Sequence, residues 1–443
     1  MFFDTIAAIS TPVGQGGIGV IRVSGSSAIS IVNKIFTKNL NNKKSHTIHY
    51  GYIVSDGLII DEVLVMLMKA PKTFTREDIV EVNCHGGYVV LNRVLELLLV
   101  NGARLATAGE FTKRAFLNGR IDLSQVEAIM DIISAKTNLS LAQATSQLMG
   151  NLSKNIKKYQ NILLEIIARI EVSIDYPEYD EAELISDGFE EDITRLIADL
   201  KAILETAATG KIIREGAVVT IVGRPNVGKS SLLNALLEED KAIVTNIAGT
   251  TRDIVSEHFS VEGVPFILQD TAGIRDTADA VERIGVERSK EAIEKSDLVI
   301  MLLDATEKIS IEEVDLMTML KNRNTLFVVN KIDCVDKYSD DDKIFISATT
   351  GEGIDELKAA MKAAVVQNLT MGTAVISNIR QKTALSCAIE ALEKVEDAIN
   401  AGFSVDFLAI DLQDAYSHLG MIIGEEVKEE IINGLFERFC LGK

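Results

Sequence analysis

The spacing of hydrophobic positions changes several times along the chain, and these changes divide it into segments of different secondary structure. Short apolar runs that follow turns, at 18–23 and 63–67, predict strands in the first segment. From about 122 to 204, apolar residues recur at steps of three and four, the spacing of one helix face: Ile156, Tyr159, Leu163, Ile166 and Ile170. We therefore expect an α+β domain followed by a helical segment.

Continuous β-branched runs mark a third segment. The run 217–222 is typical of a strand buried in a parallel sheet, and similar runs follow between helix-like stretches, at 266–268, 298–303 and 326–329. Helical spacing then returns, with one face at Leu385, Ala388, Leu392, Val395 and Ile399 and another at Leu412, Ala415, Tyr416 and Leu419. The simplest interpretation is an α/β domain inserted into a helical one, with boundaries at 1–119, 120–212, 213–370 and 371–443. Periodicity alone does not show whether the two helical parts pack together.

The composition agrees with several folded domains. At roughly 100–200 residues per domain, the chain length corresponds to two to four units, and 47% of the 443 residues are hydrophobic. The best apolar run, 298–303, is too short to span a membrane. Asp4 stands where a signal peptide would carry basic residues, so we expect a cytoplasmic protein.

The charge is strongly acidic, with 45 Lys and Arg against 65 Asp and Glu and a formal net charge of −20. Such a chain does not hold nucleic acid by its own electrostatics, so a role on RNA requires a partner. The acidic stretch 171–199 is either a solvated surface or a docking surface for a basic partner. The cysteines are too far apart for a zinc motif or a small disulfide scaffold: Cys84, Cys334, Cys387 and Cys440.

Residues 223–230 read Gly-Arg-Pro-Asn-Val-Gly-Lys-Ser and match the phosphate-binding pattern G-x-x-x-x-G-K-[ST]. The motif lies between a predicted buried strand and a helix-like stretch, which is the context that such a loop requires. The glycines let backbone N–H groups face phosphates, Lys229 reaches the β- and γ-phosphates, and Ser230 can ligate Mg²⁺. The loop therefore indicates binding of a nucleoside triphosphate.

Further motifs follow in the order expected of a GTPase. Asp-Thr-Ala-Gly at 270–273 places a carboxylate where it can hold hydrated Mg²⁺. In Asn-Lys-Ile-Asp at 330–333, Asp333 can accept from N1–H and the 2-amino group of guanine, donors that adenine does not offer in that arrangement. The predicted GTP site comprises Asn226, Val227, Gly228, Lys229, Ser230, Ser231, Thr245, Asn246, Ile247, Ala248, Gly249, Thr250, Thr251, Asp270, Thr271, Ala272, Gly273, Asn330, Lys331, Asp333, Ser347 and Ala348.

The glutamine that orients the attacking water in Ras-like enzymes is missing, because Ile274 occupies its position. Hydrolysis must recruit another group, and Glu282 is the candidate. From the residues alone, Glu282 would more often be a surface glutamate at the start of a helix.

The polar loop 245–253 offers metal ligands. Thr251 is a reasonable ligand for Mg²⁺. Oxygen atoms of Asn226, Thr245 and nearby backbone carbonyls could hold a monovalent cation beside the phosphates. Such a cation would place positive charge where an arginine finger otherwise sits.

Together these motifs resemble the MnmE (TrmE) family of tRNA modification GTPases. The resemblance rests on 223–230, on Thr-Asn-Ile-Ala-Gly-Thr-Thr-Arg-Asp at 245–253, on 270–275 with Val-Glu-Arg-Ile-Gly at 281–285, and on Cys-Leu-Gly-Lys at 440–443. It extends over the N-terminal part through 11–22, 74–78, 85–87 and 109–120.

The resemblance implies an N-terminal α+β folate-binding domain that forms a homodimer, an α-helical central domain, and an inserted α/β P-loop GTPase domain. It implies a K⁺-stimulated GTPase that works with the FAD-dependent partner MnmG in a heterotetrameric or larger complex. The reaction would place an aminomethyl or carboxymethylaminomethyl group on the 5-position of the wobble uridine of certain tRNAs, which the partner would mainly hold. The one-carbon unit would come from 5,10-methylenetetrahydrofolate, for which 5-formyltetrahydrofolate is an analogue.

Matching positions carry the family's roles onto this chain. The resemblance assigns folate binding to Arg22, Glu81, Arg120 and Lys443, K⁺ to Asn226, Thr245, Ile247 and Thr250, Mg²⁺ to Ser230 and Thr251, and the positioning of water to Glu282. Without the resemblance, Arg22 would be interpreted as a surface charge and Glu81 as a carboxylate at the end of a strand. A folate offers a glutamate carboxylate and a pterin donor edge, which suit basic side chains and one carboxylate.

Two other functions fit parts of the sequence. A ribosome-assembly or regulatory GTPase switch predicts an appended basic RNA-binding module, which this acidic chain does not show. An independent folate-dependent one-carbon transferase is disfavoured if Lys443 closes the same pocket. Cys84 and His85 provide two metal ligands, too few for a site, and Cys440 is either a thiol near the folate site or a buried small side chain.

Overall fold

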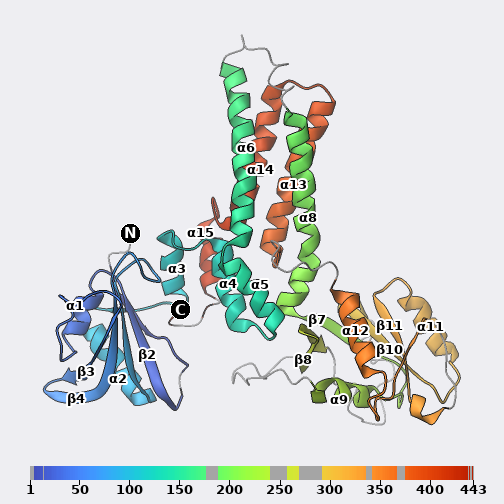
Figure 1. Ribbon diagram of the computed structural model, residues 1–443, viewed down its shortest axis with the longest axis horizontal. Helices are drawn as coiled ribbons and strands as arrows, with labels where there is room; N and C mark the ends of the chain where they lie inside the picture. The colour runs from blue at the N-terminus through green and yellow to red at the C-terminus, as the bar shows by residue number, and fades with distance from the viewer. Residues whose placement is uncertain are drawn as a thin grey trace. The chain divides into compact units, whose positions relative to one another are not determined.

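The computed structural model describes residues 4–12, 14–175, 188–239, 257–268, 292–335, 342–366, 375–437, 439 and 442. By contacts, the chain divides into two compact units, 1–130 together with 423–443, and 131–422. Figure 1 labels the elements of both units.

The first unit is built on a six-stranded sheet in the order β3-β4-β5-β2-β1-β6. Neighbouring strands are antiparallel, except for β1 and β6, which run parallel. The strands are β1 (Ile6–Ile9), β2 (Gly16–Ser24), β3 (Thr47–Ser55), β4 (Leu58–Met68), β5 (Ile79–Gly86) and β6 (Arg104–Leu105). The strands expected at 18–23 and 63–67 are confirmed as parts of β2 and β4.

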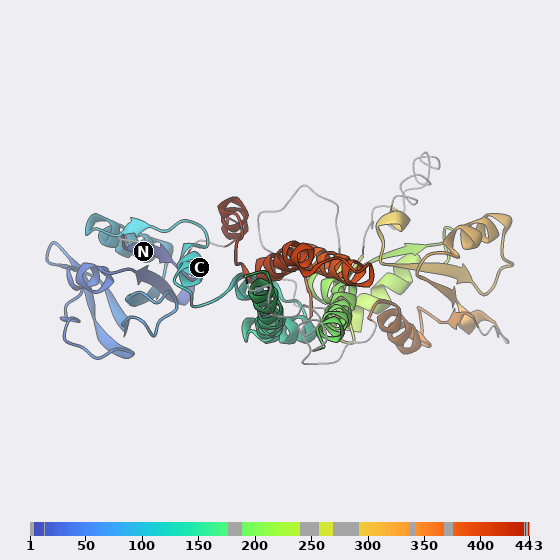
Figure 2. The same cartoon turned by 90° about the horizontal axis from the view of Figure 1, so that it is seen from above.

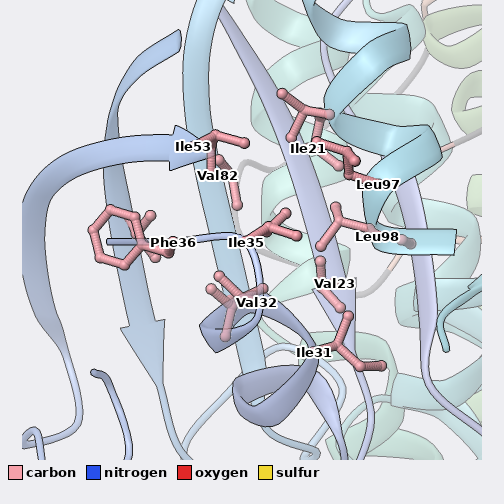
Figure 3. Packing of buried hydrophobic residues seen from close by; sticks show 14 of the residues in the cluster. Ile21, Val23, Ile31, Val32, Ile35, Phe36, Ile53, Val82, Leu97 and Leu98 are labelled. Carbon is pink, nitrogen blue, oxygen red and sulfur yellow. The ribbon is translucent and has the colours of Figure 1, made fainter. Parts of the chain in front are cut away.

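The two faces of this sheet bury different sets of side chains, because successive residues of a strand point to opposite faces. Against one face pack α1 (Ala28–Asn33) and α2 (Tyr88–Val100), and Figure 3 shows Ile31 and Leu98 of these helices beside Ile21 and Val23 of β2. On the other face, Ile6 and Ala8 of β1 pack with Phe111 of α3 (Glu110–Leu117). The sheet therefore positions α3, which the site described below uses.

The end of the chain belongs to this first unit. Helix α15 (Glu429–Phe436) contacts α3, and the Nζ of Lys113 donates to Oδ1 of Asn433 at 2.7 Å. The hydroxyl of Ser10 donates to the carbonyl of Gly442 at 3.0 Å. Helix α15 and Gly442, which the predicted boundary 371–443 groups with the second helical part, thus lie against α3 and the end of β1.

The second unit contains the helical segments. After α4 (Leu123–Ser134), which crosses the boundary between the units, come α5 (Asn138–Leu148), α6 (Asn151–Asp175), α8 (Phe189–Glu215), α13 (Ile379–Asn400) and α14 (Val405–Ile423). Figures 1 and 2 show α8 and α13 side by side, and the hydroxyl of Thr194 donates to Glu396 at 2.7 Å. The two helical parts therefore pack together, which periodicity left open. None of the helices that the structure describes is both long and apolar enough to cross a membrane.

Between α8 and α13 the chain forms a six-stranded sheet in the order β12-β11-β10-β7-β9-β8, parallel except for β8 and β9. Its elements are β7 (Ala217–Val222), α9 (Lys229–Glu239), β8 (Glu257–Val261), β9 (Val264–Leu268), β10 (Leu298–Asp304), α11 (Ile311–Leu320), β11 (Thr325–Asn330), the 3₁₀ helix η1 (Ile332–Cys334), β12 (Ile344–Phe345) and α12 (Ile354–Val365). The four strand-like runs predicted between 217 and 329 all lie within strands of this sheet. Every residue of β10 is buried, as expected for a central parallel strand covered on both faces.

Candidate functional site

The predicted phosphate loop lies between the carboxyl end of β7 and the start of α9. Gly223 has a φ of 151°, and a Cβ there would collide with the carbonyl of Leu302 in β10. Gly228 has a φ of 96°, and its Cβ would collide with the side-chain amide of Asn330. Both positions require glycine because the loop packs directly against the ends of β10 and β11.

Lys229 is held inside this loop. Its Nζ donates to the carbonyl oxygens of Gly223 at 2.7 Å and Arg224 at 2.8 Å. Burial lowers the pKa of Lys229 from its usual value, because it disfavours the charged form. A half-buried ammonium group at the start of helix α9 is well suited to an anionic ligand such as a phosphate, because a helix N-terminus also favours negative charge.

Asn330, at the end of β11, joins the phosphate loop to the base-contact loop. Its Nδ2 donates to the carbonyl of Val227 at 2.8 Å, and its Oδ1 accepts from the backbone N–H of Ala348 at 2.9 Å. The side chain is almost completely buried. One residue therefore fixes the separation between the predicted phosphate-binding and base-binding loops.

Asp333 is exposed on η1. A hydrogen bond from Ser347 lowers the pKa of this carboxyl group, so it is ionised at neutral pH and can accept two hydrogen bonds from a base. The neighbouring Lys331 is fixed by an ion pair between its Nζ and Oδ2 of Asp304, at 2.6 Å. The structure thus brings Val227 and Gly228 of the phosphate loop together with Asn330 and Ala348.

A second group of charged side chains lies in the first unit. Arg22 on β2 and Glu81 on β5 are register partners, and Nε of Arg22 donates to Oε1 of Glu81 at 2.7 Å. The guanidinium group of Arg22 lies 5.8 Å from the centroid of the Phe74 ring, and that of Arg120 lies 4.9 Å from it. The ring of Phe111 lies 5.6 Å from the Arg22 guanidinium. Two arginines, a carboxylate and two aromatic rings therefore surround one place on the sheet.

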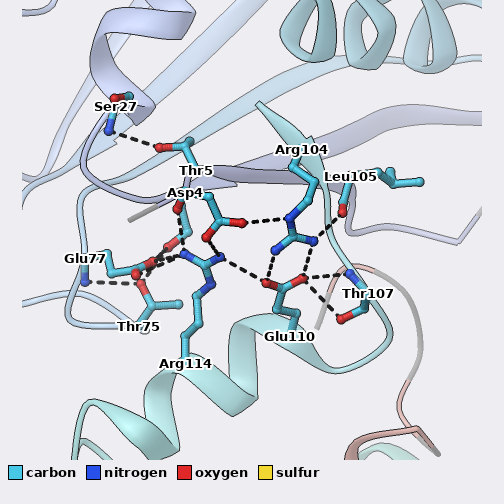
Figure 4. A network of polar contacts seen from close by, with 11 residues as sticks. Asp4, Thr5, Ser27, Thr75, Glu77, Arg104, Leu105, Thr107, Glu110 and Arg114 are labelled. Atoms are coloured by element: carbon cyan, nitrogen blue, oxygen red, sulfur yellow. Dashed lines mark hydrogen bonds and ion pairs between the residues drawn. The ribbon is translucent and has the colours of Figure 1, made fainter. Parts of the chain in front are cut away.

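In the same unit, a network of ion pairs fixes α3 (Figure 4). Arg114 is fully buried and pairs with Asp4 at 2.8 Å, Glu77 at 3.1 Å and Glu110 at 3.0 Å. Burial raises the pKa of Glu110, but hydrogen bonds from Arg104, the backbone N–H of Thr107 and Arg114 outweigh it and leave the pKa lowered. The network holds the helix that carries Phe111 against the sheet.

Comparison with known proteins identifies the family. A family model described as "GTP-binding protein TrmE N-terminus" matches residues 5–120, and one described as "MnmE helical domain" matches 123–440. The chain is 49% identical to the tRNA modification GTPase MnmE of Listeria welshimeri, with 100% of both chains covered. It is 48% identical to that of Streptococcus mutans, covering 100% of this chain and 99% of the relative. The chain belongs to the MnmE family of tRNA modification GTPases.

Two solved structures are similar to part of the chain. Era of Aquifex aeolicus bound to GDP.AlF4- is 26% identical, with 40% of this chain and 66% of that chain covered and a TM-score of 0.27. The FeoB G-domain of Methanococcus jannaschii is 29% identical, with 34% and 97% covered and a TM-score of 0.25. Scores this low carry no argument, so the assignment to the MnmE family rests on the full-length relatives and the family models.

Some predicted site residues lie outside the part of the chain that the structure describes. They are Thr245, Asn246, Ile247, Ala248, Gly249, Thr250, Thr251, Asp270, Thr271, Ala272, Gly273, Glu282 and Lys443, and Cys440 lies there as well. Their roles in MnmE-type chemistry stay predictions.

Sequence reasoning missed the aromatic part of the N-terminal group. Phe74 and Phe111 both lie in stretches that carry the resemblance to the MnmE family, but no local pattern indicates that their rings meet the same arginine. Of the metal candidates, Cys84 is buried, and burial raises its pKa to about 12. Nδ1 of His85 bonds instead to Oδ1 of Asp61 at 2.7 Å. Within the described ranges, no group of three His, Cys, Asp or Glu residues could hold a metal ion.

Proposed function

We propose that this tRNA modification GTPase is K⁺-stimulated and acts with the FAD-dependent partner MnmG. Together they would build an aminomethyl or carboxymethylaminomethyl group on the 5-position of the wobble uridine of certain tRNAs. The one-carbon unit comes from 5,10-methylenetetrahydrofolate bound in the N-terminal unit. The observation that supports this proposal best is the group of Arg22, Glu81 and Arg120 around Phe74.

The chemistry of this group suits a folate. A carboxylate such as Glu81 can accept from the N–H and amino groups along the pterin edge, and its ion pair with Arg22 orients it. The rings of Phe74 and Phe111 offer faces on which a flat heterocycle can pack. Arg120 supplies positive charge for the glutamate carboxylates of the folate.

The contacts of Gly442 support a role for the C-terminal residues in this pocket. Gly442 accepts a hydrogen bond from Ser10 at 3.0 Å, and a Cβ on Gly442 would collide with the carbonyl of Ile9. Ile9 is the register partner of Ile21, next to Arg22. Lys443 follows Gly442 directly, so its assignment to the same pocket agrees with the path of the chain.

Calorimetric titration with 5-formyltetrahydrofolate tests the pocket. Glu81→Gln, Arg120→Met and deletion of 440–443 should each weaken folate binding about tenfold or more, as loss of one charge-assisted contact does, with GTP affinity unchanged. Arg93→Met is the matched control, because Arg93 lies in the same unit in an exposed pair with Glu96. Full folate affinity in all three variants would contradict folate binding at this group of residues.

The proposed cation site involves Asn226 with Thr245, Ile247 and Thr250, while Ser230 and Thr251 ligate Mg²⁺. Asn226 is exposed in the phosphate loop with a φ of 66°, in the left-handed region that asparagine tolerates. A cation there supplies the positive charge of an arginine finger. Turnover at saturating GTP should be faster in KCl than in NaCl, and Asn226→Ala should abolish this difference. Equal wild-type rates in the two salts would contradict the cation site.

Glu282 positions the attacking water in this proposal. Glu282→Ala should lower turnover by about 10²-fold, as loss of a positioned acid–base group does, while GTP affinity is kept. Normal turnover in this variant would return Glu282 to an ordinary surface glutamate.

Homodimerisation through the N-terminal unit is supported by an exposed apolar face of its sheet. Ile48 and Tyr50 of β3 and Leu64 of β4 are exposed, and Tyr50 is the register partner of Leu64. A face of this kind on an antiparallel sheet is typical of a protein interface. Light scattering should give a dimer for the wild type and a monomer for a Tyr50→Glu, Leu64→Glu double variant; a wild-type monomer would contradict the homodimer.

MnmG and tRNA complete the proposed assembly. The net charge of −20 argues that the partner provides most of the tRNA contacts. We expect this chain and MnmG to elute as one heterotetrameric or larger complex, and a cytoplasmic location follows from action on tRNA. Separate elution of the two proteins at low salt, with tRNA bound by this chain alone, would contradict this division of roles.

A further inference from the structure

A buried carboxylate at the start of α11 faces the phosphate loop. The side chain of Glu313 is 2% exposed, and its Oε1 accepts from Nε of Arg224 at 2.7 Å. Its other oxygen, Oε2, accepts from the backbone N–H of Ser310 at 2.8 Å, while the Ser310 hydroxyl caps the N–H of Glu313 at 3.2 Å. The bond from the Ser310 N–H fixes the Glu313 carboxylate, so Glu313 is a rigid anchor for Arg224.

Arg224 is the second residue of the phosphate loop, and its main chain contacts the phosphate-binding lysine. The carbonyl oxygens of Gly223 and Arg224 both accept from Nζ of Lys229. Gly223 itself is packed against Leu302 of β10. A shift of Arg224 would therefore move the two carbonyl oxygens that hold the Lys229 ammonium group.

The same segment also reaches the base side of the site. Asp304, at the end of β10, accepts from Nζ of Lys331 at 2.6 Å and from the hydroxyl of Thr306 at 2.6 Å. Burial raises the pKa of Asp304, but the hydrogen bonds from Lys331 and Thr306 outweigh it and leave the pKa lowered. Residues 304–313 thus connect a lysine of the guanine motif to an arginine of the phosphate loop.

We infer that Glu313 is a positioning residue for GTP binding and hydrolysis. It acts through Arg224, whose backbone sets the position of Lys229. The same ion pair holds the Arg224 guanidinium at α11. The second partner of Arg224 is Glu307, at 3.0 Å, but the Glu307 side chain is 60% exposed. Such an exposed pair cannot replace the buried one, because solvent screens it.

The test compares full-length variants by release of a fluorescent GDP analogue and by steady-state GTP hydrolysis. Glu313→Gln keeps an oxygen for the Ser310 N–H but removes the charge that binds Arg224. We expect analogue release to become about 5- to 10-fold faster and the KM for GTP to rise by a similar factor, as for loss of one charge-assisted contact. Turnover at saturating GTP should change less than the KM does, because Lys229 is displaced rather than removed.

Arg224→Gln carries the same prediction, so the test does not depend on the folding of a buried variant. The double variant should release the analogue no faster than the more affected single variant, because both changes break one contact. Ser310→Ala is the matched control: it removes the helix cap but leaves the pair of Glu313 with Arg224. It should lower the thermal stability without changing analogue release.

Three outcomes would overturn the inference. The first is wild-type release in folded Glu313→Gln and Arg224→Gln. The second is faster release in Ser310→Ala as well, which would assign the effect to the stability of α11. The third is slower turnover in Arg224→Gln with unchanged or faster turnover in Glu313→Gln, which would make Arg224 a direct ligand of the phosphates.

Discussion

Replacing Arg114 by methionine should destabilise the N-terminal unit strongly. The Arg114 side chain is fully buried and pairs with Asp4, Glu77 and Glu110, of which Glu77 and Glu110 are 13% and 6% exposed. Methionine fills much of the same apolar volume, so the loss is mainly electrostatic. Breaking a buried ion pair from one side costs about 3–5 kcal/mol. Glu110 keeps its contact with Arg104, so we expect a value near the lower end, about 3 kcal/mol.

A loss of about 3 kcal/mol in a unit of this size corresponds to a fall of about 6–12 °C in Tm. Differential scanning calorimetry of the full chain measures it. The transition of the first unit is recognised because added GTP does not raise it, since ligands stabilise only the unit that binds them. Arg93→Met, in an exposed pair with Glu96, is the control and should shift this transition by no more than about 2 °C. An equal shift in the two variants would refute the view that the Arg114 network holds α3.

Three further predictions concern single residues. Asp333→Asn should weaken GTP binding and improve binding of xanthosine triphosphate, because the new amide faces the guanine donors; unchanged GTP affinity by calorimetry would contradict the assignment. Gly228→Ala should abolish nucleotide binding, since its Cβ would collide with the Asn330 amide; normal binding of a fluorescent GDP analogue would show that the loop adapts. The lowered pKa of Glu110 stabilises the first unit above its unfolded pKa of about 4.3, and this contribution is lost as pH falls through the lower folded pKa. The Tm of that unit should therefore fall more steeply below about pH 4 in the wild type than in Glu110→Gln; parallel profiles would exclude Glu110 as the cause.

Local sequence predicted the parts of the fold that depend on neighbours along the chain. The strands β7 and β10 are mostly apolar because nearly all of their residues are buried, and the phosphate loop is a single run of consecutive residues. The packing of α8 on α13 was not predictable, because periodicity gives each helix a buried face but not its partner. For the same reason, periodicity did not predict that α15 belongs to the first unit.

The site was predictable to a similar extent. Sequence motifs identified Lys229, Asn330 and Asp333 as site residues. They did not predict that the Asn330 amide links the phosphate-binding loop to the base-binding loop. The pair of Arg224 with Glu313 joins residues 89 positions apart, and each is an ordinary charged residue in its own stretch. Contacts of this kind depend on the assembled sheet, which no local pattern encodes.

We propose that this GTPase supports wobble-uridine modification with a folate bound in its N-terminal unit. The decisive measurement is mass analysis of tRNA nucleosides from cells lacking the gene, complemented with wild type, Arg22→Met or Arg93→Met. We predict that the aminomethyl-type uridines disappear without the gene, return with wild type and Arg93→Met, and stay absent or strongly reduced with Arg22→Met. Unchanged modified uridines in cells lacking the gene, or full recovery with Arg22→Met, would contradict the account.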